Sequence, residues 1–67
     1  MIVIILNGKT HSLPSSHSLK NLLQELALEN QSVAIAVNEE VIPRSKLEQI
    51  ILRDQDRVEI VRPIGGG

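Results

Sequence analysis

The sequence contains no aromatic residue and no cysteine, and these two absences exclude several classes of protein. Because Phe, Tyr and Trp are missing, the chain lacks the stacking platforms that single-stranded nucleic-acid binders use, and the net charge of -1 provides no basic surface for phosphates. We therefore expect no nucleic-acid partner. Because cysteine is missing, neither a disulfide nor a thiolate zinc site supplements the core, and aliphatic packing must supply the stability.

Groups that would make the chain an enzyme are also scarce. The sequence has no cysteine nucleophile, no glycine-rich phosphate loop within a βα unit and no metal-ligand spacing. Its only imidazoles, His11 and His17, lie in polar stretches and are interpreted as solvated surface residues. The adjacent carboxylates of Glu39 and Glu40 are assigned to a solvated turn, since consecutive residues point apart. We expect a protein that is not an enzyme and binds no cofactor or metal itself.

The length of 67 residues allows one domain without a deep cleft, because chains of this size bury only about 60% of the surface exposed on unfolding. The apolar run at residues 1–6 is far shorter than the roughly 18 residues of a membrane span, and no basic region precedes it. These features predict a cytoplasmic protein with no membrane partner. Residues 1–62 are expected to form the domain and residues 63–67 a flexible tail.

The first half of the sequence predicts a β-hairpin followed by one helix. Residues 2–6 are rich in β-branched side chains, as in a central strand, and Asn7-Gly8 suits a type I′ turn that returns residues 9–13 antiparallel. Ser18 is the candidate N-cap of the helix, and helix entry also explains the serines before it. Leucines at i, i+3, i+4 and i+7 predict one stripe that packs on the sheet, namely Leu19, Leu22, Leu23 and Leu26. The helix is expected to end at residues 29–31.

The second half predicts two full strands and a short edge piece. Residues 33–37 form the third strand, residues 41–42 the edge piece closed by a proline, residues 44–50 one loose helical turn and residues 57–62 the last strand. With the first and last strands parallel at the centre, this order predicts an α+β fold. We expect a ubiquitin-like β-grasp, with a mixed sheet of four to five strands and one main helix on one face.

The C-terminal glycines are the best candidate for chemistry. A glycine tract is also typical of a frayed terminus, but five residues extend roughly 16 Å at about 3.3 Å per residue and present no bulky side chain at their end. Such a tail is able to thread into a partner's active site. The Gly67 carboxylate is ionised at neutral pH and is a poor electrophile. Adenylation by an ATP-using partner would activate it for attack by a sulfur nucleophile.

Three stretches carry a family resemblance: residues 37–44 (VNEEVIPR), residues 52–61 (LRDQDRVEIV) and the terminal Gly66-Gly67. Together they resemble the ThiS family, the sulfur carriers of thiamine biosynthesis, over residues 2–67. The resemblance implies that an E1-like, ThiF-type adenylyltransferase uses ATP to activate Gly67, that a sulfur donor system converts it to a thiocarboxylate, and that a ThiG-type thiazole synthase receives the sulfur. Gly65 adds a third glycine, and Gln55 stands where the family often has glycine.

Other functions remain open at this level. The molybdopterin-synthase small subunit uses the same fold and chemistry but is generally longer, and a ubiquitin-like protein modifier would join Gly67 to lysines. A purely structural β-grasp interaction module is a further alternative. For any partner, the expected docking surface is the sheet face away from the helix, including Val61 and Ile64, because one helix leaves that face uncovered.

Overall fold

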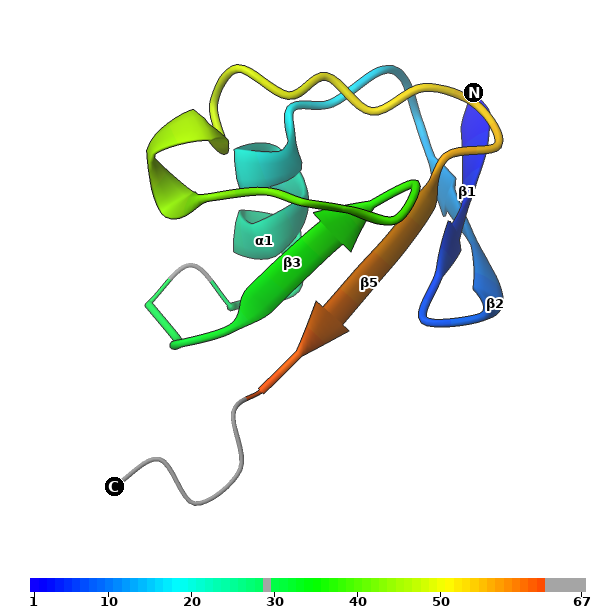
Figure 1. The fold of residues 1–67 in the computed structure, drawn as a ribbon. Helices are drawn as coiled ribbons and strands as arrows, with labels where there is room; N and C mark the ends of the chain where they lie inside the picture. The colour runs from blue at the N-terminus through cyan, green and yellow to red at the C-terminus, as the bar shows by residue number, and fades with distance from the viewer. Residues whose placement is uncertain (29, 63–67) are drawn as a thin grey trace.

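The computed structural model describes residues 1–28 and 30–62. Its elements lie in the order β1 (Ile2–Leu6), β2 (Lys9–Leu13), α1 (Leu19–Glu25), β3 (Ala34–Val37), β4 (Glu40–Val41), the 3-10 helix η1 (Arg44–Lys46) and β5 (Arg57–Val61). Figure 1 labels β1, β2, α1, β3 and β5 among them. The short edge piece starts one residue earlier than expected, and only three residues of the expected turn at 44–50 are helical.

The strands form one mixed sheet in the order β2-β1-β5-β3-β4. β1 and β5 are parallel neighbours at its centre, with Ile5 opposite Arg57 and Leu6 opposite Val58, whereas the other pairs are antiparallel. Figure 1 shows α1 on one side of this sheet, with β5 between β1 and β3. The predicted β-grasp is therefore confirmed, with five strands.

Two turns with positive φ angles shape the edges of the sheet. Asn7 and Gly8 have φ angles of 50° and 84°, as a type I′ turn requires, so the predicted hairpin is confirmed. Asn38 and Glu39 repeat this pattern between β3 and β4, with φ angles of 51° and 71°. Glu39 is exposed in this turn, as expected, whereas Glu40 is exposed but belongs to β4 rather than to the turn.

Side-chain and main-chain contacts cap the start of α1. The Oγ of Ser18 accepts from the Asn21 amide at 3.1 Å, which confirms the predicted N-cap. The amide of Leu19 donates to the Ile50 carbonyl at 2.7 Å, so the segment after η1 runs beside the helix start. Ile51 also forms an isolated bridge with Ser18. The helix is thus fixed by residues about 30 positions later in the chain.

The helix ends at Glu25, and the expectation that it reaches residues 29–31 is wrong. Ala27 has a φ angle of 60°, and its amide donates to the Gln24 carbonyl at 3.0 Å. The next amide, that of Leu28, reaches back to the Leu23 carbonyl at 2.8 Å. This pair of bonds is a Schellman motif, which stops a helix even though alanine rather than glycine occupies the left-handed position.

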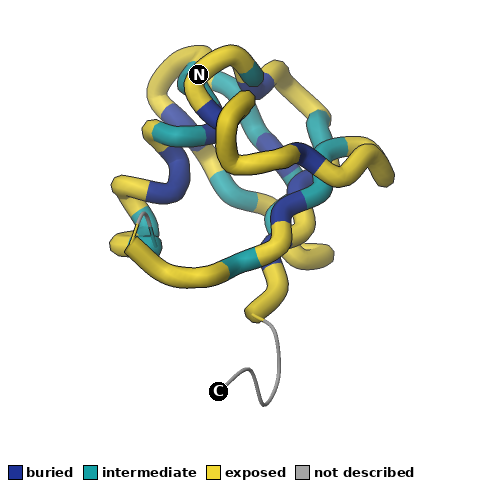
Figure 2. The backbone as a smooth tube through the Cα atoms, turned by 60° about the vertical axis from the view of Figure 1, so that its left-hand side comes forward, coloured by how far each residue is buried: buried dark blue, intermediate teal, exposed yellow. Residues whose placement is uncertain are grey.

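The core is aliphatic and lies between α1 and the sheet. The helix buries Leu19, Leu22 and Leu23 completely or almost completely, whereas the fourth leucine of the predicted stripe, Leu26, is only partly buried after the last turn. The remaining buried residues come from strands and loops and appear as dark segments in Figure 2: Ile4, Leu13, Ile35, Ile42, Leu47, Leu52, Val58 and Ile60. No polar residue among those described is buried.

The turn before β5 ties the last strand to the first. The Asp54 carboxylate accepts from the Val3 amide at 2.7 Å, and the Gln55 amide donates to the Val3 carbonyl at 2.6 Å. Gln55 reaches this position with a φ angle of 72°. A side chain is disfavoured in this left-handed region, which explains why glycine would suit the position.

Gln55→Gly is expected to raise the free energy of unfolding by about 0.5–1 kcal/mol, because relief of left-handed strain exceeds the extra chain entropy of glycine. Urea unfolding measures this change. Gln55→Ala, which keeps a Cβ at the same φ, serves as the control and should leave the stability close to that of the parent chain. A glycine variant less stable than the parent would contradict the strain argument.

Candidate functional site

The structure describes the route to the glycine tail rather than the tail itself. Ile64, Gly65, Gly66 and Gly67 lie outside the described residues, and so does the expected tail segment 63–67. β5 ends at Val61, and both Val61 and the next residue, Arg62, are exposed (Figure 2). The central strand of the sheet is therefore the last described element before the predicted reactive end in the sequence.

Val61 lies on the sheet face away from α1, as predicted. Side chains along β5 alternate, so Val58 and Ile60 enter the core while Val61 is 58% exposed. Across the sheet, Val61 is opposite Ala34 of β3, and Ala36 is opposite Val41 of β4. Val41 is 73% exposed. We call this group the open-face patch: Ala34, Ala36, Val41 and Val61.

A shallow hollow lies within the open-face patch. The patch residues line it together with Ile35 and Glu59. The two alanines have little bulk between the larger valines, which explains why the surface dips there. An apolar partner side chain that filled the hollow would remove exposed aliphatic surface from water, and Glu59 offers a charge at its margin. The sequence pattern identified Val61 but missed Ala34, Ala36 and Val41, because their common face depends on strand register.

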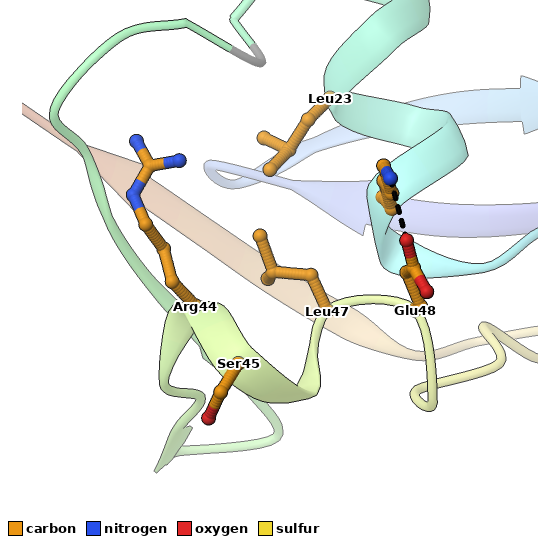
Figure 3. A pocket seen from close by; sticks show the side chains of 6 residues that line it. Leu23, Arg44, Ser45, Leu47 and Glu48 are labelled. Carbon is orange, nitrogen blue, oxygen red and sulfur yellow. Dashed lines mark hydrogen bonds and ion pairs between the residues drawn. The ribbon is translucent and has the colours of Figure 1, made fainter.

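A second groove lies on the helix side, between α1 and η1 (Figure 3). Leu23 and Leu47 point toward one another there, and both belong to the core. At one side, the Lys20 ammonium forms an ion pair with the exposed Glu48 carboxylate. The hydrogen bond and the positive charge of Lys20 lower the pKa of Glu48 below its ordinary value. The groove is therefore the line of contact where η1 packs on the helix.

Both histidines are half-buried rather than fully exposed. His11 is half-buried, on the strand position opposite Ile4, and its Nε2 is buried without a hydrogen-bond partner. The prediction of a solvated surface residue is therefore wrong for His11, because its strand position faces the helix layer. Within residues 1–28 and 30–62, no cluster of His, Asp and Glu is arranged to hold a metal ion. In that same part of the chain, no helix has the length and apolar character needed to cross a bilayer.

Asn7, which the sequence analysis assigned only to a turn, also makes a contact near the end of β5. Its side-chain Oδ1 accepts from the Ile60 amide at 2.8 Å, and its Nδ2 donates to the Ile60 carbonyl at 3.1 Å. The pair of bonds lies two residues before Arg62, the last described residue. A turn residue of the first hairpin thus holds the strand that leads to the tail.

The sequence model of the ThiS family matches residues 4–67, which include the glycine tail. The chain belongs to the ThiS family. This membership confirms the resemblance carried by the two internal stretches and the terminal glycines.

Individual relatives agree with this family membership. The chain is 35% identical to the sulfur carrier protein ThiS of Thermus thermophilus, over 97% of this chain and 100% of that protein. A crystal structure of the thiamine biosynthesis protein ThiS from Geobacter metallireducens superposes with a TM-score of 0.86 at 28% identity, covering 98% of this chain and all of that one. The chain is also 36% identical over 96% of its length to a thiazole synthase of Paramagnetospirillum magneticum, of which it spans only 20%.

Proposed function

We propose that this chain is a sulfur carrier for the thiazole of thiamine and that Gly67 is the residue that bears the sulfur. The observation that carries the proposal is the family match, which extends over residues 4–67 and so includes the tail as well as the domain. Relatives named sulfur carrier protein ThiS match over most of their length. The chain acts as a substrate of partner enzymes rather than as a catalyst.

The chemistry proposed for Gly67 takes two displacements. A carboxylate oxygen attacks the α-phosphorus of ATP in an E1-like, ThiF-type partner, which releases pyrophosphate and leaves an acyl adenylate. A sulfide-equivalent nucleophile from the sulfur donor then attacks the acyl carbon and displaces AMP, leaving a thiocarboxylate. Gly67 has no Cβ, so its carbonyl is open to attack. The partner supplies the ATP site, and the requirement for ATP accords with a cytoplasmic location.

A ThiG-type thiazole synthase is the proposed acceptor of the sulfur. Two relatives are named thiazole synthase, and this chain matches 20% of the length of each. A carrier-like segment on the same chain as a synthase places donor and acceptor at high effective concentration. We infer that separate carrier and synthase chains meet for the same transfer.

The proposed docking surface for these partners is the open-face patch together with Ile64. Val61 lies at the end of β5 nearest the tail, Val41 and Val61 are exposed, and burial of their aliphatic surface on a partner would stabilise the complex. Docking of the domain would hold the tail beside the partner's active site. The transfer then becomes effectively intramolecular.

Incubation with ATP, a ThiF-type enzyme and sulfide should raise the intact mass by the exchange of one oxygen for sulfur, with the change located at Gly67 by fragmentation. A variant with one alanine added after Gly67 is the control, and it should show no change because the carboxylate is displaced from the active site. If the parent chain acquires no sulfur, the carrier function is refuted.

The acceptor is identified by reconstitution of the thiocarboxylated chain. Transfer to thiazole synthase but not to molybdopterin synthase is expected, and the reverse result would assign the chain to the molybdopterin pathway. Products in which Gly67 is joined to lysine through an isopeptide bond would instead indicate a protein modifier.

Val61→Asp is expected to raise the KM of the activating enzyme for this carrier at least about tenfold, because a carboxylate would be desolvated in an apolar contact. Ser12→Asp places the same charge on the open face of β2, at the far side of the sheet, and should leave KM unchanged. Steady-state kinetics measure both variants. Equal KM values for Val61→Asp and the parent chain would place the docking surface elsewhere.

A further inference from the structure

The side chain of Asn7 takes the place of a missing strand residue beside β5. β1 ends at Leu6, and the chain then turns away into β2. The main-chain amide of Asn7 still follows the parallel ladder and donates to the Val58 carbonyl at 2.9 Å. Its side-chain amide continues that ladder by bonding both main-chain groups of Ile60. Because one of these two hydrogen bonds is accepted and the other is donated, they also determine which side-chain atom is oxygen and which is nitrogen.

This contact lies at the last position where the first hairpin reaches β5. Main-chain groups of successive strand residues point to opposite neighbours, so those of Val58 and Ile60 point toward β1 and those of Val61 toward β3. On the β3 side, Val61 is paired with Ala34, the first residue of β3. Asn7 and Ala34 therefore hold the two edges of β5 immediately before Arg62.

We propose that Asn7 is a positioning residue for sulfur loading, which fixes the direction in which the chain leaves the sheet toward Gly67. This inference rests on the proposed function. Asn7 does not touch the reacting atoms, and it acts through Ile60. Because Gly67 follows Ile60 by only seven positions, the orientation of the chain at Ile60 limits where the carboxylate can reach.

Loss of the Asn7 contact and loss of the docking surface should change different kinetic constants. Docking of the domain determines how tightly the carrier binds its activating enzyme, and therefore KM. Once the domain is docked, arrival of the carboxylate at ATP is an intramolecular step whose rate depends on effective concentration. Loss of the Asn7 contact should lower kcat, whereas loss of the open-face patch should raise KM.

Asn38 provides a matched control at the opposite end of β5. It also has a positive φ angle, and its Oδ1 accepts from the Arg57 amide at 2.9 Å. Substitution of either asparagine by glycine tolerates the left-handed backbone and removes only the side-chain bonds. The two variants therefore remove side-chain contacts from the two ends of β5. Asn7→Gly acts at the end near the tail, and Asn38→Gly acts at the far end.

In the ThiF-type assay with ATP and sulfide, Asn7→Gly is expected to lower kcat about three- to tenfold with KM for the carrier unchanged. Asn38→Gly should leave both constants unchanged. Hydrogen exchange should accelerate at the Ile60 amide in the first variant and at the Arg57 amide in the second, which shows that each contact was removed from a folded chain.

Equal kcat values for Asn7→Gly and the parent chain, despite faster exchange at Ile60, would overturn the positioning role. An equal fall of kcat in Asn38→Gly would also overturn it, because the effect would then follow general stability. If the parent chain itself is not loaded with sulfur, the proposed function fails first and the inference falls with it. An active parent chain with unaffected variants refutes the inference alone.

Discussion

The parallel pairing of β1 with β5 is the constraint on which the rest of the structure depends. It places the first and last strands side by side at the centre of the sheet and requires the intervening residues to cross from one edge to the other. The helix, β3 and the loop after η1 form that crossing, and their apolar side chains pack into the core. Turn contacts around Val3 and Ile60 reinforce both ends of the pair. The strand that leads to the glycine tail is therefore among the most firmly held elements.

One helix on one face leaves the other face of the sheet in contact with water. A small chain without aromatic residues or disulfides depends on a single aliphatic layer for stability, and the open-face patch contributes little to it. Those residues are thus available for contact with a partner at little cost to the fold. Under the proposed function, the helix-side core that stabilises the chain is separate from the face proposed for docking.

Much of the fold followed from local sequence patterns with a clear physical basis. Asn7-Gly8 specified a type I′ turn, and Ser18 before a leucine stripe specified the start of the helix. The end of the helix did not follow, because Ala27 adopts a left-handed conformation that alanine seldom takes. The half-buried position of His11 was missed for a similar reason, since it depends on which face of β2 meets the helix.

The sequence by itself determined the element order, the family and the tail as the candidate reactive group, because turn residues, hydrophobic period and family motifs are all local in the chain. Only the tertiary structure decided which residues share the open face, since Ala34 and Val41 join Val61 through strand register. It also decided the contact of Asn7 with Ile60, across 53 positions of sequence. Such contacts depend on long-range pairing, which no short stretch of sequence encodes.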